Sequence, residues 1–145
     1  MISEKKIVLG LKIIKSNGER MPNKIQRVRI ASGAIAADGS AVAYSGNIAG
    51  KILAVQVNYP AATCTVDIDT DGELSAQKIV DLAAANTDAT YYPRAFAQKI
   101  DGTTLLYTTG EEVPVEFVVS GRLKLTIASG TATQTVTVDV IYEEY

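Results

Sequence analysis

The stretch VPVEFVVSGRLKLTIASGTATQTVTVDVIY, residues 113–142, decides the fold. Apolar and polar side chains alternate along it, and many of the apolar ones are β-branched, which is typical of strands that bury one face. In a helix the same side chains would scatter around the circumference, so the pattern excludes a helix. We predict three consecutive antiparallel strands whose apolar face needs a second layer to cover it. The apolar positions are Val115, Phe117, Val119, Leu123, Leu125, Ile127, Val136, Val138, Val140 and Tyr142.

The rest of the chain carries further strand signals, separated by turn signals about every ten residues. Residues 51–59 alternate with few charges on either face, which predicts a central strand that Pro60 ends. We expect a short strand through residues 42–44 and a return strand over residues 63–69. Periodicity leaves helix and strand open for residues 74–85. The predicted class is all-β, an antiparallel β-sandwich or barrel.

Composition narrows the class of protein. The 145 residues are 47% apolar and 21% charged, which indicates one domain with a sizeable core. No apolar run approaches the roughly 20 residues of a membrane span. The N-terminus superficially resembles a signal peptide, but Lys12 interrupts its apolar stretch and no small-residue cleavage site follows. We therefore expect a protein made and used in a cytosol.

The chain is poor in residues for catalysis. It contains no histidine, which excludes Ser-His and Cys-His dyads and His-ligated metal sites. Cys64 is the only cysteine and shares the parity of Val66 and Ile68, so we expect a buried small hydrophobe rather than a nucleophile. We predict that the protein is not an enzyme, with no catalytic residue and no cofactor.

Charge is unevenly distributed along the chain. Residues 1–30 carry eight basic and two acidic side chains, a net charge of +6, which leaves −8 for residues 31–145. Such a segment is attracted to acidic surfaces, a second copy included. Nucleic acid is not the expected partner, because no aromatic residues are interleaved and the acidic remainder would repel phosphates. The candidate partner-binding residues are Lys5, Lys6, Lys12, Lys15, Arg20, Lys24, Arg27 and Arg29.

These residues define a predicted N-terminal arm, residues 1–31, which precedes a β-sandwich domain over residues 32–145. Ser16-Asn17-Gly18-Glu19 is a strong turn signal, so we expect a hairpin of two strands, residues 5–15 and 24–30. A short helix over residues 4–14 is the alternative.

Three aspartates form a candidate metal site. Asp67, Asp69, Asp71 and Gly72 match the opening of the calcium-loop pattern D-x-D-x-D-G. The twelfth position of that loop should be a bidentate Glu, but here it is Lys78. Strand alternation also explains the aspartates, since Val66 and Ile68 would then point inward.

A second distinctive cluster is Tyr91-Tyr92-Pro93-Arg94. Pro93 bars a central position in a sheet, so we expect an edge strand or a bend. The cluster is interpreted as a structural corner. The alternative is a binding site in which Arg94 lies over a tyrosine ring.

From about residue 36 onward the order of features resembles the small β-sandwich head proteins of tailed bacteriophages, the capsid decoration, cement or auxiliary proteins. Each motif is short, and their order carries the resemblance, which covers about three-quarters of the chain. The matching segments are Asp38–Val42, Gly50–Val55, Thr90–Arg94, Asp101-Gly102 and Gly121–Leu125.

The resemblance implies a jelly-roll-like β-sandwich that binds and stabilises a shell of major capsid protein. It also implies many copies on the virion surface, assembled in the host cytoplasm as homo-oligomers, with a trimer expected. Neither nucleic acid nor membrane is an expected partner. The basic arm would then grip a capsid subunit or a neighbouring copy by adding strands to an edge.

Three other functions stay open from the residues alone. The first is another virion part with the same fold, in the tail, neck or fibre base. The second is a carbohydrate-binding sandwich that uses Tyr91, Tyr92 and Tyr107. The third is a carboxylate-based hydrolase built on Asp67, Asp69 or Glu73, although no paired carboxylates indicate a catalytic cleft.

Overall fold

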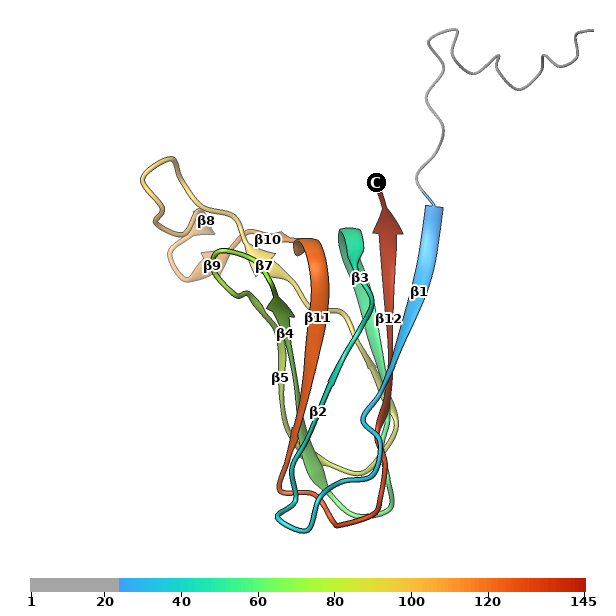
Figure 1. The fold of residues 1–145 in the computed structure, drawn as a ribbon. Coiled ribbons are helices and arrows are strands. Elements are labelled where there is room, and N and C mark those ends of the chain that lie inside the picture. The colour runs from blue at the N-terminus through green and yellow to red at the C-terminus, as the bar shows by residue number, and fades with distance from the viewer. Residues whose placement is uncertain (1–23) are drawn as a thin grey trace, which may run out of the picture.

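The computed structural model describes residues 24–145, and every regular element in this part of the chain is a β-strand (Figure 1). All strand pairs are antiparallel, which confirms the predicted all-β, antiparallel class. Within residues 24–145 there is no helix with the length and apolar character needed to cross a membrane. The strands are β1 (Lys24–Ala31), β2 (Ala41–Tyr44), β3 (Ile48–Asn58), β4 (Cys64–Asp71), β5 (Lys78–Ala85), β6 (Ala89–Tyr91), β7 (Ala95–Phe96), β8 (Leu106–Thr108), β9 (Glu111–Glu112), β10 (Pro114–Val115), β11 (Val118–Ala128) and β12 (Thr137–Glu144).

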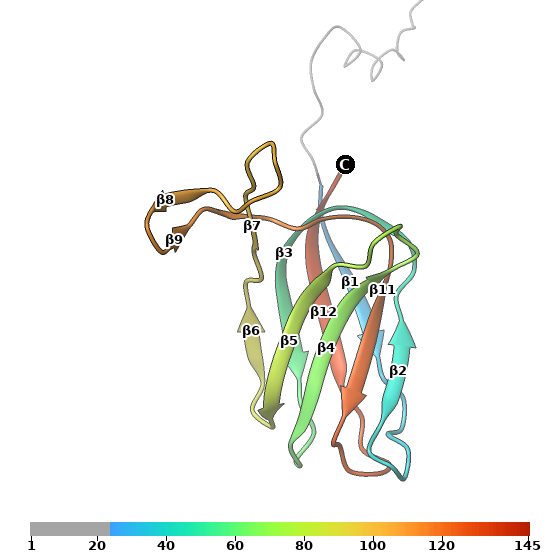
Figure 2. The same cartoon turned by 90° about the vertical axis from the view of Figure 1, so that its left-hand side faces the viewer.

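Eight of these strands form one continuous sheet, here called the body, which divides into two halves (Figures 1 and 2). In the β1 half the order is β1, β12, β3 and β6, and in the β2 half it is β2, β11, β4 and β5. The halves join where Ile48–Lys51 of β3 pairs with Val118–Gly121 of β11, a segment here called the junction. Beyond it, β3 runs on between β12 and β6, and β11 runs on between β2 and β4.

The core lies between the halves, and both contribute to it. Burial of one such side chain stabilises the folded state by about 1.5–3 kcal/mol relative to exposure. The predicted inward positions of residues 123–127 and 136–142 are confirmed, whereas Val115 is exposed. The largest fully buried side chains are Ile30, Ile52, Val55, Val57, Val66, Ile68, Leu123, Leu125, Ile127, Val136, Val138 and Val140.

A β-bulge in β3 decides which of its side chains reach this core. Tyr142 of β12 pairs with Ile52, and Ile141 pairs with Ala54, so Leu53 is an extra residue in the ladder. The bulge lets Ile52 and Val55 both point inward, while Leu53 is half-buried. Simple alternation placed Leu53 on the face of Val55, and it missed the bulge.

Alternation predicted two strands joined by a turn over residues 113–127, but in the structure one long strand follows the two-residue β10. One strand, β11, runs through Gly121, whose φ of 125° is a conformation that favours glycine. Glycine can bend a strand without ending it, so β11 leaves the junction and continues into the β2 half. The consecutive strands β11 and β12 do not pair with each other: β12 lies between β1 and β3, and β3 separates it from β11 in the sheet.

Residues 24–31, which the sequence assigned to the predicted arm, form a strand of the body, and this confirms the strand predicted over residues 24–30. This segment is β1, which pairs with β12 along its whole length and contributes Ile30 to the core. The first predicted strand of the hairpin, its turn and the alternative helix fall on residues 1–23, which lie outside the described residues. Residues 78–85 form β5, which settles the helix–strand alternative in favour of a strand.

Gly50→Ala should destabilise the fold strongly, because the added Cβ would overlap the carbonyl oxygen of Glu143 on β12. We expect a loss of at least about 2 kcal/mol in the free energy of unfolding, measured by urea denaturation. Gly46→Ala is the matched control, since no atom lies within 4 Å of its added Cβ. The control should change stability by less than about 0.5 kcal/mol, and equal effects of the two variants would contradict the crowding at the junction.

Candidate functional site

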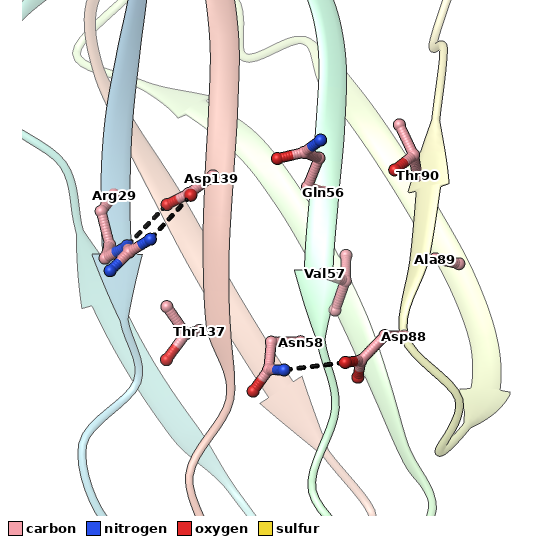
Figure 3. Close-up of a pocket in the computed structure, with 9 residues that line it drawn as sticks. All are labelled: Arg29, Gln56, Val57, Asn58, Asp88, Ala89, Thr90, Thr137 and Asp139. Carbon is pink, nitrogen blue, oxygen red and sulfur yellow. Dashed lines mark hydrogen bonds and ion pairs between the residues drawn. The ribbon is translucent and has the colours of Figure 1, made fainter.

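A polar depression of about 410 Å³ lies on the outer face of the β1 half (Figure 3). Side chains on this face alternate with the core residues of the same strands. Strand register places Arg29 beside Asp139, Asp139 beside Gln56, and Gln56 beside Thr90. One polar row thus crosses all four strands, from β1 through β12 and β3 to β6.

Asp139 is the fixed point of this row. Arg29 donates two hydrogen bonds to it, from Nε to Oδ1 at 2.7 Å and from Nη2 to Oδ2 at 2.9 Å. Arg27 donates a third, from Nη1 to Oδ2 at 3.0 Å. The Asp139 side chain is 9% exposed, and the hydrogen bonds from Arg29 above all hold its pKa below the ordinary value, although burial opposes this.

A second polar pair closes the depression at one end. Asn58 of β3 donates from Nδ2 to Oδ2 of Asp88 at 2.9 Å, and Oδ1 of Asp88 accepts from the backbone N–H of Tyr59 at 2.9 Å. Asp88 stands in the turn before β6, so these bonds tie that turn to β3. Thr137 of β12 completes this end of the lining.

Between β6 and β11 the chain leaves the body and forms an insertion, residues 92–117, that projects from one end (Figure 2). Its strands pair only with each other, β7 with β10 and β8 with β9. Backbone N–H groups of Ala97, Leu105 and Val113 donate to the carbonyls of Val113, Ala97 and Leu105 respectively, at 2.8–3.3 Å. The insertion therefore has a hydrogen-bonded framework of its own.

The insertion presents an apolar surface. None of its described side chains is buried, and it holds half of the exposed large apolar residues of residues 24–145. Ile100 is fully exposed. A concentration of this kind is typical of a surface that contacts another protein. The six residues are Tyr92, Phe96, Ile100, Leu105, Leu106 and Val115.

The Tyr91–Arg94 cluster forms the corner between β6 and this insertion. Arg94 donates from Nη1 to the carbonyl oxygens of Pro93 at 2.7 Å and Leu53 at 3.3 Å. Tyr91 lies opposite the buried Val55, with its hydroxyl 3.4 Å from that of Tyr59. These contacts support the structural-corner interpretation, because Arg94 is engaged with backbone.

The cation–π contact of the described residues is made by Arg122 and Tyr44, a pair that the sequence did not predict. The Arg122 guanidinium is 4.0 Å from the ring centroid of Tyr44. Lys124 is the direct partner of Tyr44 across β11 and β2, so Arg122 is its diagonal neighbour on the same face. That neighbourhood requires the β2–β11 register, and no local sequence signal gives it.

The three candidate metal-binding aspartates lie on the outward face of β4, as alternation predicts. Lys78 Nζ lies 3.5 Å from both Asp67 Oδ2 and Asp69 Oδ1, and Arg122 Nε lies 2.5 Å from Asp71 Oδ2. The carboxylates thus pair with cationic side chains along the strand. Within the described part of the chain, no three His, Cys, Asp or Glu side chains are placed to hold a metal ion.

Glu73 and Cys64 are the remaining residues that the sequence singled out, and they lie apart from each other. Glu73 accepts hydrogen bonds from Gln77 Nε2 at 2.8 Å and from the backbone N–H of Ser120 at 3.1 Å, so it ties the β4–β5 turn to β11. Cys64 is fully buried as predicted, and burial raises the pKa of its thiol.

Of the candidate partner-binding residues, Arg27 and Arg29 are engaged with Asp139 inside the chain, and Lys24 begins β1. The remaining candidates lie outside the described residues. They are Lys5, Lys6, Lys12, Lys15 and Arg20.

Asp139→Asn should lower the free energy of unfolding by about 1–2 kcal/mol at neutral pH, because Arg27 and Arg29 lose the anion between them. The folded state lowers the pKa of Asp139 from 3.8, so the unfolded chain binds more protons at acid pH. The stability that the ionised Asp139 contributes to the folded state is fully present well above pH 3.8, and it is lost as the pH falls through and below that value. Urea denaturation of both proteins across this range should therefore show the difference between them narrowing in acid.

Asp71→Asn is the comparison variant, because the Asp71 side chain is 33% exposed whereas that of Asp139 is 9% exposed. We expect it to cost less than about 1 kcal/mol. A larger loss from Asp71→Asn than from Asp139→Asn would contradict the assignment of Asp139 as the fixed point.

Comparison of the chain with protein-family models, with curated proteins and with solved structures finds no match. Two surfaces of the described residues differ in character. The insertion projects and carries exposed large apolar side chains, whereas the depression is polar and concave. Surfaces of such different character suit different classes of ligand.

Proposed function

We propose that the chain is a virion structural protein, a capsid decoration protein that binds and stabilises the major capsid protein shell of a tailed bacteriophage. The observation that carries the proposal is the insertion, which projects from the body (Figure 2) and carries six exposed large apolar side chains. The proposal places many copies on the capsid surface, as homo-oligomers assembled in the host cytoplasm.

The strand order of the body supports a jelly-roll sandwich as the scaffold. In chain order, β1, β3, β6 and β12 go to the β1 half, while β2, β4, β5 and β11 go to the β2 half. Eight strands that are divided between two sheets in this way are typical of jelly rolls, which occur in viral capsid proteins and lectins. A fold does not assign a function by itself, so the insertion carries more weight.

The insertion suits protein contact for two physical reasons. Apolar side chains in water favour association, because burial against a partner removes their surface from solvent. The backbone bonds among Ala97, Leu105 and Val113 order the insertion before it binds, which reduces the entropy lost on association. A single copy would bind the shell with modest affinity, but many copies attached to one shell would stabilise it together.

Charge supports a second contact through the arm. Residues 1–23 carry five basic and two acidic side chains, a net charge of +3, while residues 24–145 carry a net −5. A basic arm is attracted to an acidic neighbour, either a second copy or a capsid subunit. In the proposal the insertion seats the module on the shell, and the arm links it to its neighbour.

The double variant Phe96→Asp, Ile100→Asp should bind phage heads that lack the protein at least about tenfold more weakly than the wild type. The reason is that the contact would have to bury two charges without partners. Co-sedimentation with heads prepared without the gene measures the binding. Unchanged thermal unfolding would show that the fold is intact.

Val42→Asp is the control, since Val42 is 50% exposed and belongs to β2, a strand that lies on the other side of the body from the insertion (Figure 2). It should leave binding unchanged. Equal binding by all three proteins, or absence of the chain from purified particles, would count against the proposal. Copy number per particle separates the alternatives, because a decoration protein is present in hundreds of copies and a neck or tail part in few.

Deletion of residues 1–22 keeps β1 complete and tests the arm. We expect reduced occupancy on heads, with the loss largest at low salt, where attraction between basic and acidic surfaces is strongest. Quantitative gel densitometry of salt-washed particles measures it. Full occupancy after the deletion would show that the insertion alone suffices.

A further inference from the structure

We propose that the polar depression on the β1 half binds a neutral saccharide. The depression lies on the face of the sheet, and the insertion projects from its end, so this proposal does not depend on the proposed shell contact (Figures 2 and 3). Three features carry it: balanced charge, unpaired hydrogen-bonding groups on rigid strands, and size.

The charges in and beside the depression balance. Arg27 and Arg29 both bind Asp139, and Asp88 supplies the second carboxylate. Two cations and two anions give this region no net charge, which favours neither a phosphate nor a divalent metal ion. A ligand without net charge that is recognised by hydrogen bonds therefore suits the site best.

Three side chains in the depression offer such bonds. Among residues 24–145, no hydrogen bond engages the side chains of Gln56, Thr90 and Thr137. A Gln amide presents donors and an acceptor, and each Thr hydroxyl can act as either. The hydroxyl groups of a sugar have the same dual character, so they match this set.

The framework around these groups is preorganised. Gln56, Thr90 and Thr137 are mounted on paired strands, and Asp139 and Asn58 beside them are held by hydrogen bonds. The volume of about 410 Å³ lies at the lower end of the range for ligand sites, which suits one or two sugar rings. No aromatic side chain lines the depression, so we expect dissociation constants on the order of 1 mM.

NMR titration of the full chain with maltose, lactose and chitobiose tests the proposal. At least one of these neutral disaccharides should shift the amides of residues 56–58, 88–90 and 137–139. Gln56→Ala and Thr90→Val should each weaken that binding by at least about tenfold, since each removes a hydrogen-bonding group at the centre of the row. Gln98→Ala, at an exposed position in the insertion, is the control and should leave binding unchanged.

Three results would overturn the saccharide assignment. They are no shift with any of the three sugars, binding that is unaffected by both substitutions, and binding of inorganic phosphate or Ca²⁺ at these same amides. The Phe96→Asp, Ile100→Asp variant should bind the sugar like the wild type. Loss of shell binding in that variant with retained sugar binding would show that the two surfaces act separately.

Discussion

The described architecture depends on β3 and β11, the two strands whose pairing joins the halves of the body. β3 and β11 pair with each other only at the junction, and then separate to pair with β12 and β6, and with β2 and β4. β3 and β11 can diverge in this way only if the side chains at the junction leave room for the backbone of the neighbouring strand. Gly50 provides that room against β12, and Gly121 provides the bend in β11. The two glycines therefore allow both halves to cover one core.

The same junction positions the insertion. The insertion begins after β6, which pairs with β3, and it ends at β11, whose first residues pair with β3 as well. Both of its ends are thus anchored on one central strand, although its own strands make no ladder with the body. A rigid body with an internally bonded projection can present apolar side chains without burying them. The outer face of the β1 half contrasts with this, because the side chains that line its depression are mainly polar.

Sequence periodicity predicted the parts of this architecture that depend on local alternation. It correctly predicted that Cys64, Val66 and Ile68 are buried. It also predicted the buried positions of the last strand, which are Val136, Val138, Val140 and Tyr142. It could not predict the bend at Gly121 or the bulge at Leu53, because each is defined by a partner strand distant in sequence. Alternation placed Asp139 outward, but the flanking arginines come from a strand about 110 residues away. In the sequence, the apolar residues of the insertion resemble core residues, because a local pattern does not show whether a second layer covers them.

The most direct test of the proposal that the chain decorates a capsid is a cryo-electron microscopy structure, at a resolution that shows side chains, of intact particles of the bacteriophage that is proposed to encode it. The account predicts density for the body on the outer capsid surface, with Phe96 and Ile100 packed against a capsid subunit and the depression on the β1 half open to solvent. Density in which the insertion points into solvent while another face of the body contacts the shell would contradict it, as would a shell without the protein.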